Sequence, residues 1–262
     1  MKVVLLAHTP NPEEIIAAAG RGCYSVKPSS ELMNMNNKEM KKTLDMIHGS
    51  VLEHVSFTFS VEGVSRVLSH QLVRHRIASF SQQSMRYVDV HKLWDHIVIP
   101  KTVADVQFEE FCFADTISEQ PMTQKIEAYE NALHELMLEM DKHKILSEDQ
   151  RYFVPNGVMT NITLTMNLRE LQHFFGLRRC KRAQWEIREM ANKMAELIES
   201  ECPVLTNHIN LGPQCEQTGR CPEHKGCGRQ LITVKEAEES HDAFKGERKD
   251  HTFFGKFQKV KE

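Results

Sequence analysis

The stretch VSFTFSVEGVSRVLSHQLVRHRIASFSQQSMRY, residues 55–87, changes its pattern twice and so indicates a fold with both strands and helices. Its first part alternates between apolar and polar residues, and one face carries Val55, Phe57, Phe59 and Val61. That period of two predicts a half-buried strand. From Ser65 to about His75 the apolar residues recur at helical spacing, which predicts a helix. The following SFSQQSMRYV segment has no such stripe and is predicted to be a loop leading into a strand.

Strand and helix patterns also mix on either side of this stretch. Short apolar or β-branched runs predict strands at residues 2–7, 96–100 and 157–168. Apolar stripes and terminal signals predict helices at residues 12–22, 37–48, 122–145, 168–178 and 183–201, and a capping box at Ser147–Gln150. Because these elements lack a regular βαβ rhythm, we expect an α+β fold, a mainly antiparallel sheet flanked by long helices. The sequence has no GxGxxG motif, which argues against a Rossmann-type dinucleotide site.

The two longest predicted helices each carry an apolar stripe. On the helix at 122–145 the stripe is Ile126, Tyr129, Leu133, Leu136, Met137 and Met140. On the helix at 183–201 it is Trp185, Ile187, Met190, Met194, Leu197 and Ile198. Apolar side chains at this spacing are typical of an amphipathic helix, so we assign Trp185 and the methionines of the second stripe to the core and give them no chemistry.

Composition changes after Pro203, which suggests a main domain at 1–203 and an extension at 204–262. The extension is rich in cysteine and charge, and we expect it to be ordered only where something clips it. Its Cys215, Cys221, His224 and Cys227 are soft ligands that fit a zinc ion. Their spacing is not that of a standard zinc ribbon, so a structured loop with free thiols is the favoured interpretation.

The bulk properties exclude several classes of protein. A net charge of −3 over 262 residues argues against non-specific coating of nucleic acid. The N-terminal MKVVLLAHTP has too short an apolar run for a signal peptide or a membrane span, so we expect no membrane partner. The seven cysteines are an odd number without an export signal, which favours reduced thiols in the cytoplasm.

The segment Gln71–Tyr87 concentrates cations, with Arg74, His75, Arg76 and Arg86 close together. Arginine forks bind phosphates bidentately, and a loop of small polar residues offers backbone N–H groups to an anion. The segment therefore predicts a site for a phosphorylated ligand. Two other interpretations stay open: a solvated helix end, or a nucleic-acid surface, which the acidic net charge and the lack of interleaved aromatic residues weaken.

Arg74-His75-Arg76, followed after seven residues by Ser84, resembles the signature of the flavin-dependent thymidylate synthases. The resemblance extends over about residues 1–205. Upstream it includes His48-Gly-Ser50-Val-Leu-Glu53-His54. Downstream it includes Arg151-Tyr-Phe-Val-Pro155, Asn167-Leu168-Arg169, His173, Leu177-Arg178 and Ala183-Gln-Trp185-Glu-Ile187.

The resemblance implies a fold and an activity. It implies the α+β fold of thymidylate synthase complementing proteins, with residues 1–203 as the catalytic domain. The activity is methylation of dUMP to dTMP, with FAD as cofactor and with methylenetetrahydrofolate and NADPH as co-substrates. Members are homotetramers whose active sites draw residues from several subunits, and no nucleic-acid partner is implied. Two alternatives are a non-catalytic nucleotide- or RNA-binding module and a different flavin-dependent NADPH oxidase.

The resemblance also implies residue roles. The positions that match FAD ligands are Ser50, Arg74, His75, Arg76, Gln82, Asn167, Leu168, Arg169 and His173. Those that match the dUMP site are Gln71, Leu72, Val73, Arg74, Gln82, Gln83, Ser84, Met85, Arg86, Arg151 and Arg178. Arg178 is the catalytic candidate, because a fixed cation at the N3/O2 edge of uracil would stabilise charge that develops on the ring. Ser81-Gln82 departs from the family's common Asn-Glu, so a carboxylate role at position 82 is lost.

Overall fold

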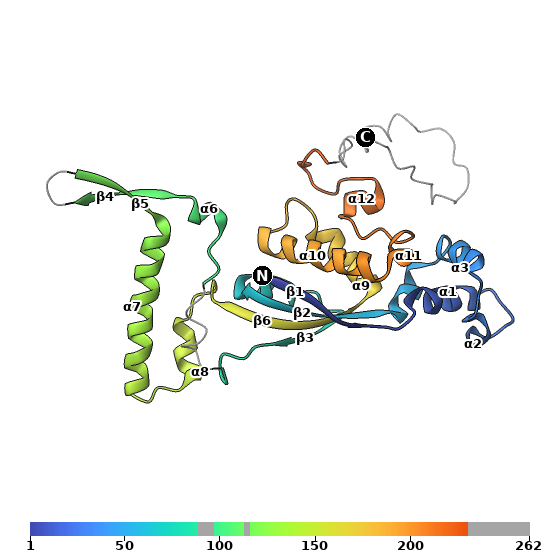
Figure 1. Cartoon of the computed structure of the whole chain (residues 1–262), viewed down its shortest axis with the longest axis horizontal. Coiled ribbons are helices and arrows are strands. Elements are labelled where there is room, and N and C mark those ends of the chain that lie inside the picture. The colour runs from blue at the N-terminus through green and yellow to red at the C-terminus, as the bar shows by residue number, and fades with distance from the viewer. Residues whose placement is uncertain (89–96, 113–115, 230–262) are drawn as a thin grey trace.

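A four-stranded antiparallel sheet with the strand order β1-β2-β6-β3 organises the fold (Figure 1). The strands are β1 (Lys2–His8), β2 (Ser56–Ser65), β3 (Ala78–Gln82) and β6 (Met159–Asn167). The structure is a computed structural model and describes residues 1–88, 97–112 and 116–229. The antiparallel sheet confirms the predicted α+β fold, and the strands at 2–7, 55–61 and 157–168 are present.

One face of the sheet is buried, as the alternation at 55–61 predicts. Phe57, Phe59 and Val61 pair across β2 and β6 with three other buried residues, in the order Met166, Leu164 and Ile162. The opposite face is polar, and the hydroxyls of Thr58 and Thr165 are 2.9 Å apart across the same two strands. An antiparallel sheet with one apolar face packs helices on that face only.

Helices α9 (Leu168–Arg178) and α10 (Trp185–Glu201) cover the apolar face (Figure 1). Helix α4 (Arg66–Leu72) continues directly from β2, and α1 (Pro12–Gly22) lies at one end of the sheet. The predicted bounds of α1 and α9 are confirmed. The shorter helices are α2 (Ser29–Leu32), α3 (Asn37–Leu44), η1 (Gly49–His54), α6 (Lys101–Ala104), α8 (Ser147–Gln150), η2 (Arg151–Phe153), α11 (Pro203–Thr206) and α12 (Gln214–Thr218).

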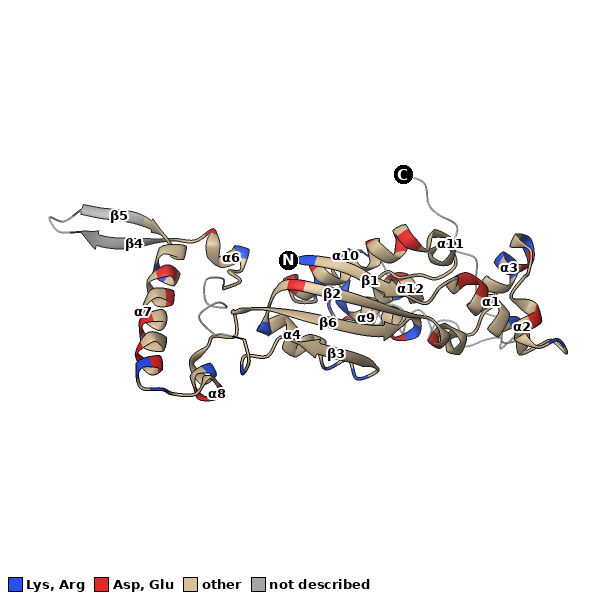
Figure 2. Cartoon of the chain, turned by 60° about the horizontal axis from the view of Figure 1, so that its bottom comes forward, with Lys and Arg blue, Asp and Glu red and all other residues tan. Residues whose placement is uncertain are grey.

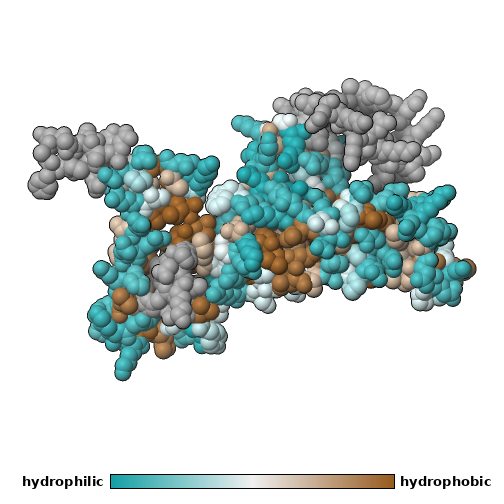
Figure 3. All heavy atoms as spheres, viewed as in Figure 1, coloured by the Kyte–Doolittle hydropathy of each residue, from teal (hydrophilic) through white to brown (hydrophobic). Residues whose placement is uncertain are grey.

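An arm made of α7 (Met122–Lys142) and the hairpin of β4 (Gln107–Cys112) and β5 (Thr116–Pro121) stands apart from the sheet (Figure 1). Of the stripe predicted for this helix only Leu133 and Met137 are buried. Tyr129 is 51% exposed and Leu136 is 41% exposed. Figure 3 shows hydrophobic residues along the arm's surface. Among the described residues, no second layer of this chain covers the helix, so most of the predicted apolar stripe is exposed or half-buried.

Three predicted element boundaries are corrected by tertiary contacts. The helix at 37–48 ends at Leu44, and the carboxylate of Asp45 lies 2.7 Å from Nδ1 of His208, which fixes the turn that follows. The helix at 65–75 ends at Leu72, before the arginine pair. Part of the predicted loop at 79–88 is strand β3, because its backbone pairs with the free edge of β6.

Three other local predictions also fail. In the strand expected at 96–100, the described residues make a single bridge, from Ile97 to Val158, and residue 96 lies outside the described ranges. Helix α8 begins after Leu146 with no side-chain cap, because the amide of Gln150 donates instead to Asp141 and to the carbonyl of Ile145. Trp185 begins α10 and is 37% exposed, whereas the methionines of the same stripe are buried.

The segment after Pro203 begins as part of the main core. Leu205, Ile209 and Leu211 are buried in the same cluster as the sheet and α10. The division at 203/204 into a catalytic domain and an extension stays a prediction. Both signs of charge are interspersed on α3 and α7 (Figure 2). Across the described residues, none of the helices combines the length and apolarity that crossing a membrane requires.

Candidate active site

His75 is the centre of a buried polar cluster between the arginine-rich segment and α9. Its Nε2 accepts a hydrogen bond from Nε of Arg178 at 3.1 Å, and its Nδ1 lies 3.3 Å from Oε1 of Glu170. The imidazole packs edge-on against Phe174, with ring centroids 4.9 Å apart, and the ring of His173 lies 6.2 Å away between centroids. These contacts hold the Arg178 guanidinium through Nε and leave its terminal amino groups for a ligand.

The surroundings of His75 keep its ring neutral. Burial, and then the positive charges of Arg178 and His173, lower the pKa of His75 to about 4. The contact with Glu170 is therefore a hydrogen bond from a neutral imidazole, although its geometry would also fit an ion pair. Because Nε2 accepts from Arg178, the ring proton belongs on Nδ1, where it is donated to Glu170. Burial raises the pKa of Glu170 and lowers that of Arg178.

His75, Glu170 and His173 are also the one group of three potential metal donors found among the described residues, with donor atoms within 4.8 Å of one another. Both nitrogens of His75 are already engaged, and one of them faces a guanidinium. A divalent cation beside Arg178 would meet like-charge repulsion. The three side chains therefore fit a hydrogen-bonded cluster better than a metal centre.

Two other predicted FAD residues, Asn167 and Arg169, lie at the start of α9. Asn167 is the N-cap of α9, and its side chain accepts a hydrogen bond from the Glu170 backbone N–H at 2.8 Å. Arg169 lies directly over Gly49, where an added Cβ would overlap the guanidinium. Ser50 lines a neighbouring cavity of about 360 Å³. Gly49 therefore allows the close approach that places Arg169 beside Ser50.

A second cluster of arginines forms where the loop after β3 meets α8. Arg86 pairs with Glu148 at 2.9 Å, and Nε of Arg151 donates to the Glu148 carbonyl. Arg66 and Arg151 line a cavity of about 280 Å³ together with Met85. One terminal nitrogen of Arg66, Nη1, is buried without a hydrogen-bond partner. Burial and the charge of Arg151 lower the pKa of Arg66, so the cavity is a cationic environment that favours an anion.

Gln82 joins β3 to its neighbours. Its amide donates to the hydroxyl of Ser69 on α4 at 2.9 Å and to that of Thr160 on β6 at 3.4 Å. The next residue, Gln83, donates its backbone N–H to the carbonyl of Asn161 at 2.9 Å. The amide at position 82 thus acts as a donor, which a carboxylate could not do.

The remaining predicted residues are buried, half-buried or exposed. The side chains of Leu72, Met85 and Leu168 are buried in the protein, so Leu72 and Leu168 offer a ligand only their backbone groups. Gln71 and Ser84 are half-buried, and the predicted residues with exposed side chains are Val73, Arg74, Arg76, Arg86, Arg151, Arg169 and His173. Arg178 joins the first cluster through His75, whereas Arg86 and Arg151 belong to the second through their contacts with Glu148.

Sequence reasoning missed Glu170, Glu148, Arg66 and Gly49. Glu170 precedes His173 by one helical turn, and Glu148 precedes Arg151 by the same spacing, so both were visible as helical neighbours of predicted residues. Arg66 gave no local signal, because its importance comes from burial beside Arg151.

The lowered pKa of His75 predicts how stability depends on pH. Because the folded-state pKa is about 4 and the ordinary value is 6.5, the unfolded chain takes up the proton first as the pH falls. The free energy of unfolding should therefore fall as the pH is lowered from 6.5 to about 4, by at most about 1.4 kcal/mol per pH unit. The raised pKa of Glu170 acts in the opposite direction and offsets part of the loss.

The variant His75→Gln keeps an acceptor and a donor but does not titrate. Its melting temperature should fall less than that of the wild type between about pH 7 and about pH 5. Equal slopes for the two proteins in calorimetry would show that His75 is not the titrating group.

An antiparallel α+β fold with two arginine clusters fits a protein that binds phosphorylated ligands, and the comparisons with known proteins identify its family. The family model described as "Thymidylate synthase complementing protein" matches residues 4–204. A flavin-dependent thymidylate synthase of Geobacter sulfurreducens is 43% identical over 228 residues, covering 85% of this chain and 91% of the relative. That of Pyrococcus abyssi is 41% identical, covering 86% and 91%. The chain therefore belongs to the flavin-dependent thymidylate synthase family.

Solved structures agree with this assignment. The flavin-dependent thymidylate synthase of Helicobacter pylori, complexed with FAD and dUMP, is 25% identical, with a TM-score of 0.58 over 80% of this chain and 99% of that one. A UMP/dUMP methylase of Streptomyces cacaoi has a TM-score of 0.62 at 20% identity, over 81% of this chain and 96% of that one, and shows the shared fold.

Proposed function

We propose that this enzyme methylates dUMP to dTMP, with FAD as cofactor, methylenetetrahydrofolate as one-carbon donor and NADPH as reductant. Family membership over residues 4–204 supports the reaction, and the Helicobacter pylori relative was solved with FAD and dUMP. The observation that carries the proposal is Arg178, held through Nε by neutral His75 with its terminal amino groups left for a substrate. Electrostatic stabilisation by such a fixed cation is the role that the chemistry of uracil C5 needs.

The residues around η1 and α9 fit a flavin dinucleotide. Exposed Arg74 and Arg76 provide permanent positive charge for a pyrophosphate, and Arg169 is held beside Ser50 by the close approach at Gly49. The 360 Å³ cavity lined by Ser50 is large enough for only part of a dinucleotide. When bound, FAD would supply the hydride and the carrier for the one-carbon group. The protein's part is to bind, orient and tune charge.

The second arginine cluster fits the phosphate of dUMP. Arg86, Arg151 and the Ser84 loop are the predicted phosphate ligands, and Arg66, whose buried Nη1 lacks a partner, lines the same cavity as Arg151. A phosphate there would satisfy that donor and balance the like charges of Arg66 and Arg151. Arg178 lies in the other cluster, so the proposal includes active sites completed by neighbouring subunits.

We also propose a homotetramer in the cytoplasm. The exposed apolar residues of α7, Tyr129 and Leu136 among them, form a surface that a second copy of the chain would cover (Figure 3). Light scattering coupled to gel filtration should give about four times the 30.3 kDa of one chain. A monomer with intact flavin binding would contradict this.

The first test of the function is release of tritium from dUMP labelled at C5, with FAD, NADPH and methylenetetrahydrofolate supplied. Release that requires every component supports thymidylate synthesis. Consumption of NADPH at a rate that does not depend on dUMP would indicate the alternative NADPH oxidase. A colourless protein that shifts an RNA probe would indicate a binding module.

Arg76→Ala should lose the flavin, because it removes a permanent charge that we assign to the pyrophosphate. The absorbance spectrum of the purified variant should show at least about a tenfold drop in bound FAD, equivalent to about 1.4 kcal/mol. Arg220→Ala, which removes an exposed arginine after α12, is the matched control and should stay yellow. Full flavin content in Arg76→Ala would remove Arg76 from the cofactor site.

A further inference from the structure

Four cysteines from two separate segments line one small cavity beside the end of α9. Cys180 follows the helix, and Cys215, Cys221 and Cys227 come from α12 and the loop after it. The cavity has a volume of about 40 Å³, and its other walls include Gly176, Leu177 and Pro213. This volume exceeds what one water molecule needs, so a single ion fits.

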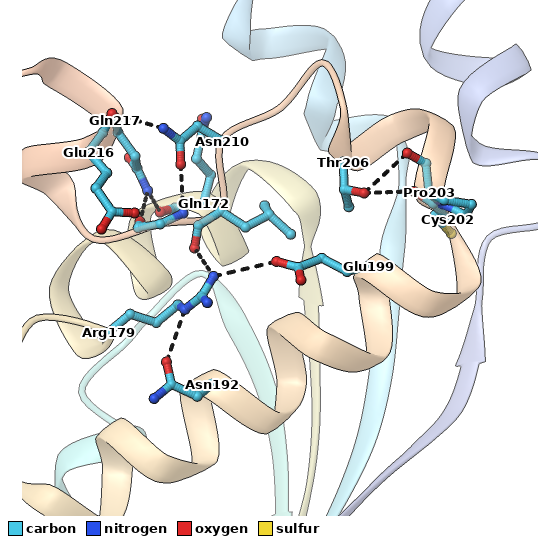
Figure 4. A network of polar contacts seen from close by, with 12 residues as sticks. Gln172, Arg179, Asn192, Glu199, Cys202, Pro203, Thr206, Asn210, Glu216 and Gln217 are labelled. Atoms are coloured by element: carbon cyan, nitrogen blue, oxygen red, sulfur yellow. Dashed lines mark hydrogen bonds and ion pairs between the residues drawn. The ribbon is translucent and has the colours of Figure 1, made fainter. Parts of the chain in front are cut away.

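The two segments are held together by contacts that do not involve sulfur. The amide of Gln217 on α12 donates to the carbonyls of Gln172 on α9 and of Gly212, at 2.8 and 2.7 Å. Arg179 donates to the carbonyl of Leu211 at 2.8 Å and to Asn192 on α10 (Figure 4). The cysteines are therefore brought to one place by the fold.

The loop between Cys221 and Cys227 is held against the segment that follows α9. Arg182 donates to the carbonyl of Lys225 at 2.8 Å and pairs with Glu223 at 3.3 Å. His224, the fourth zinc ligand suggested by sequence spacing, is exposed and does not line the cavity. Cys180 lines the cavity instead.

The chemistry of the cavity suits a soft cation. All four cysteines are free thiols, and Arg182 and Arg229 lie near enough to offset the negative charge of bound thiolates. Burial raises the pKa of Cys215, followed by the effects of Glu216 and Cys221, so without a metal its thiol stays protonated. No three of the sulfur atoms lie within 4.8 Å of one another among the described residues. Exposed Cys227 and its loop must close inwards to complete a tetrahedron.

We propose that Cys180, Cys215, Cys221 and Cys227 bind one zinc ion at a structural site. Binding forms four Zn–S bonds and releases the thiol protons to solvent, with no change of oxidation state. The ion would anchor the segment 215–227 to the end of α9, two residues after Arg178.

The test is the metal content of the untagged full-length protein, purified without chelators from cells supplied with zinc. Elemental analysis should find about one zinc per chain, the stoichiometry of a tetrahedral four-thiolate site. Cys180→Ser and Cys221→Ser should lose the metal. Cys23→Ser, at an exposed cysteine outside the cavity, and His224→Ala should keep it.

Thiol alkylation separates metal binding from misfolding. In folded wild-type protein the four cysteines should react with iodoacetamide only after a chelator removes the zinc, and the chelator should lower the melting temperature. Metal-free wild-type protein, zinc retained by Cys180→Ser, or a disulfide among these cysteines in the intact mass would each overturn the proposal. None of these measurements depends on synthase activity.

Discussion

Replacing Arg178 with alanine should lower the turnover number by about 10²–10³-fold, the cost of removing one fixed charge-stabilising donor from an active site. The reason lies in how the side chain is held. Nε is bound to His75, whose tautomer is set by Glu170, so the guanidinium is oriented before substrate arrives. A preorganised cation stabilises charge on the uracil ring without reorganising during the reaction. Because FAD is assigned to other residues, the variant should stay yellow.

The measurement is the steady-state rate of tritium release together with the flavin absorbance of the same sample. A loss in kcat that exceeds the change in KM identifies an interaction made mainly in the transition state. Arg178→Lys keeps the charge but loses the Nε hydrogen bond to His75. Its turnover number should therefore lie between those of the wild type and Arg178→Ala. Near-normal turnover in Arg178→Ala would disprove the electrostatic role.

The sheet and the two helices that cover it were predictable because their patterns are local. The alternation at 55–61 places Phe57 and Phe59 on the buried face, and the bounds predicted for the helix at 168–178 match those of α9. Strand β3 was not predictable, because Ala78–Gln82 has a weak pattern and becomes a strand by pairing with the edge of β6. Its conformation is decided by a partner about eighty residues away in the chain.

The residues of the candidate site also divide into those that the local sequence predicts and those that it does not. Arginine and histidine residues were visible as a cluster in the sequence, but their partners were not. Glu170 would be read as an ordinary charged residue of an amphipathic helix, yet it is buried against His75. Trp185 shows the reverse case, since a helix stripe predicted burial and the chain leaves the side chain partly exposed. Burial that depends on other segments or other subunits has no local signature.

Glu186→Ala should cost about 3 kcal/mol of stability, because it leaves a buried N–H group without an acceptor. Glu186 is 2% exposed and accepts hydrogen bonds from both the backbone N–H and the hydroxyl of Ser65. Ser65 in turn caps α4 by accepting from the Leu68 N–H at 3.1 Å. One carboxylate therefore lies at the N-terminal ends of α4 and α10, where both helix dipoles favour it.

For a chain of this size the loss corresponds to a melting temperature lower by about 5–10 °C. Glu196→Ala is the matched control, because it removes an exposed glutamate from the same helix, and it should change the melting temperature by less than about 2 °C. Glu186→Gln keeps one acceptor for the Ser65 N–H, so its melting temperature should lie between those of the wild type and Glu186→Ala. If Glu186→Ala melted like Glu196→Ala, then water would be replacing the carboxylate. In that case the junction between β2 and α4, from which the arginine-rich segment leads, would be held by the backbone hydrogen bonds of Arg66 and Val67 and by packing of Leu68 and Leu72.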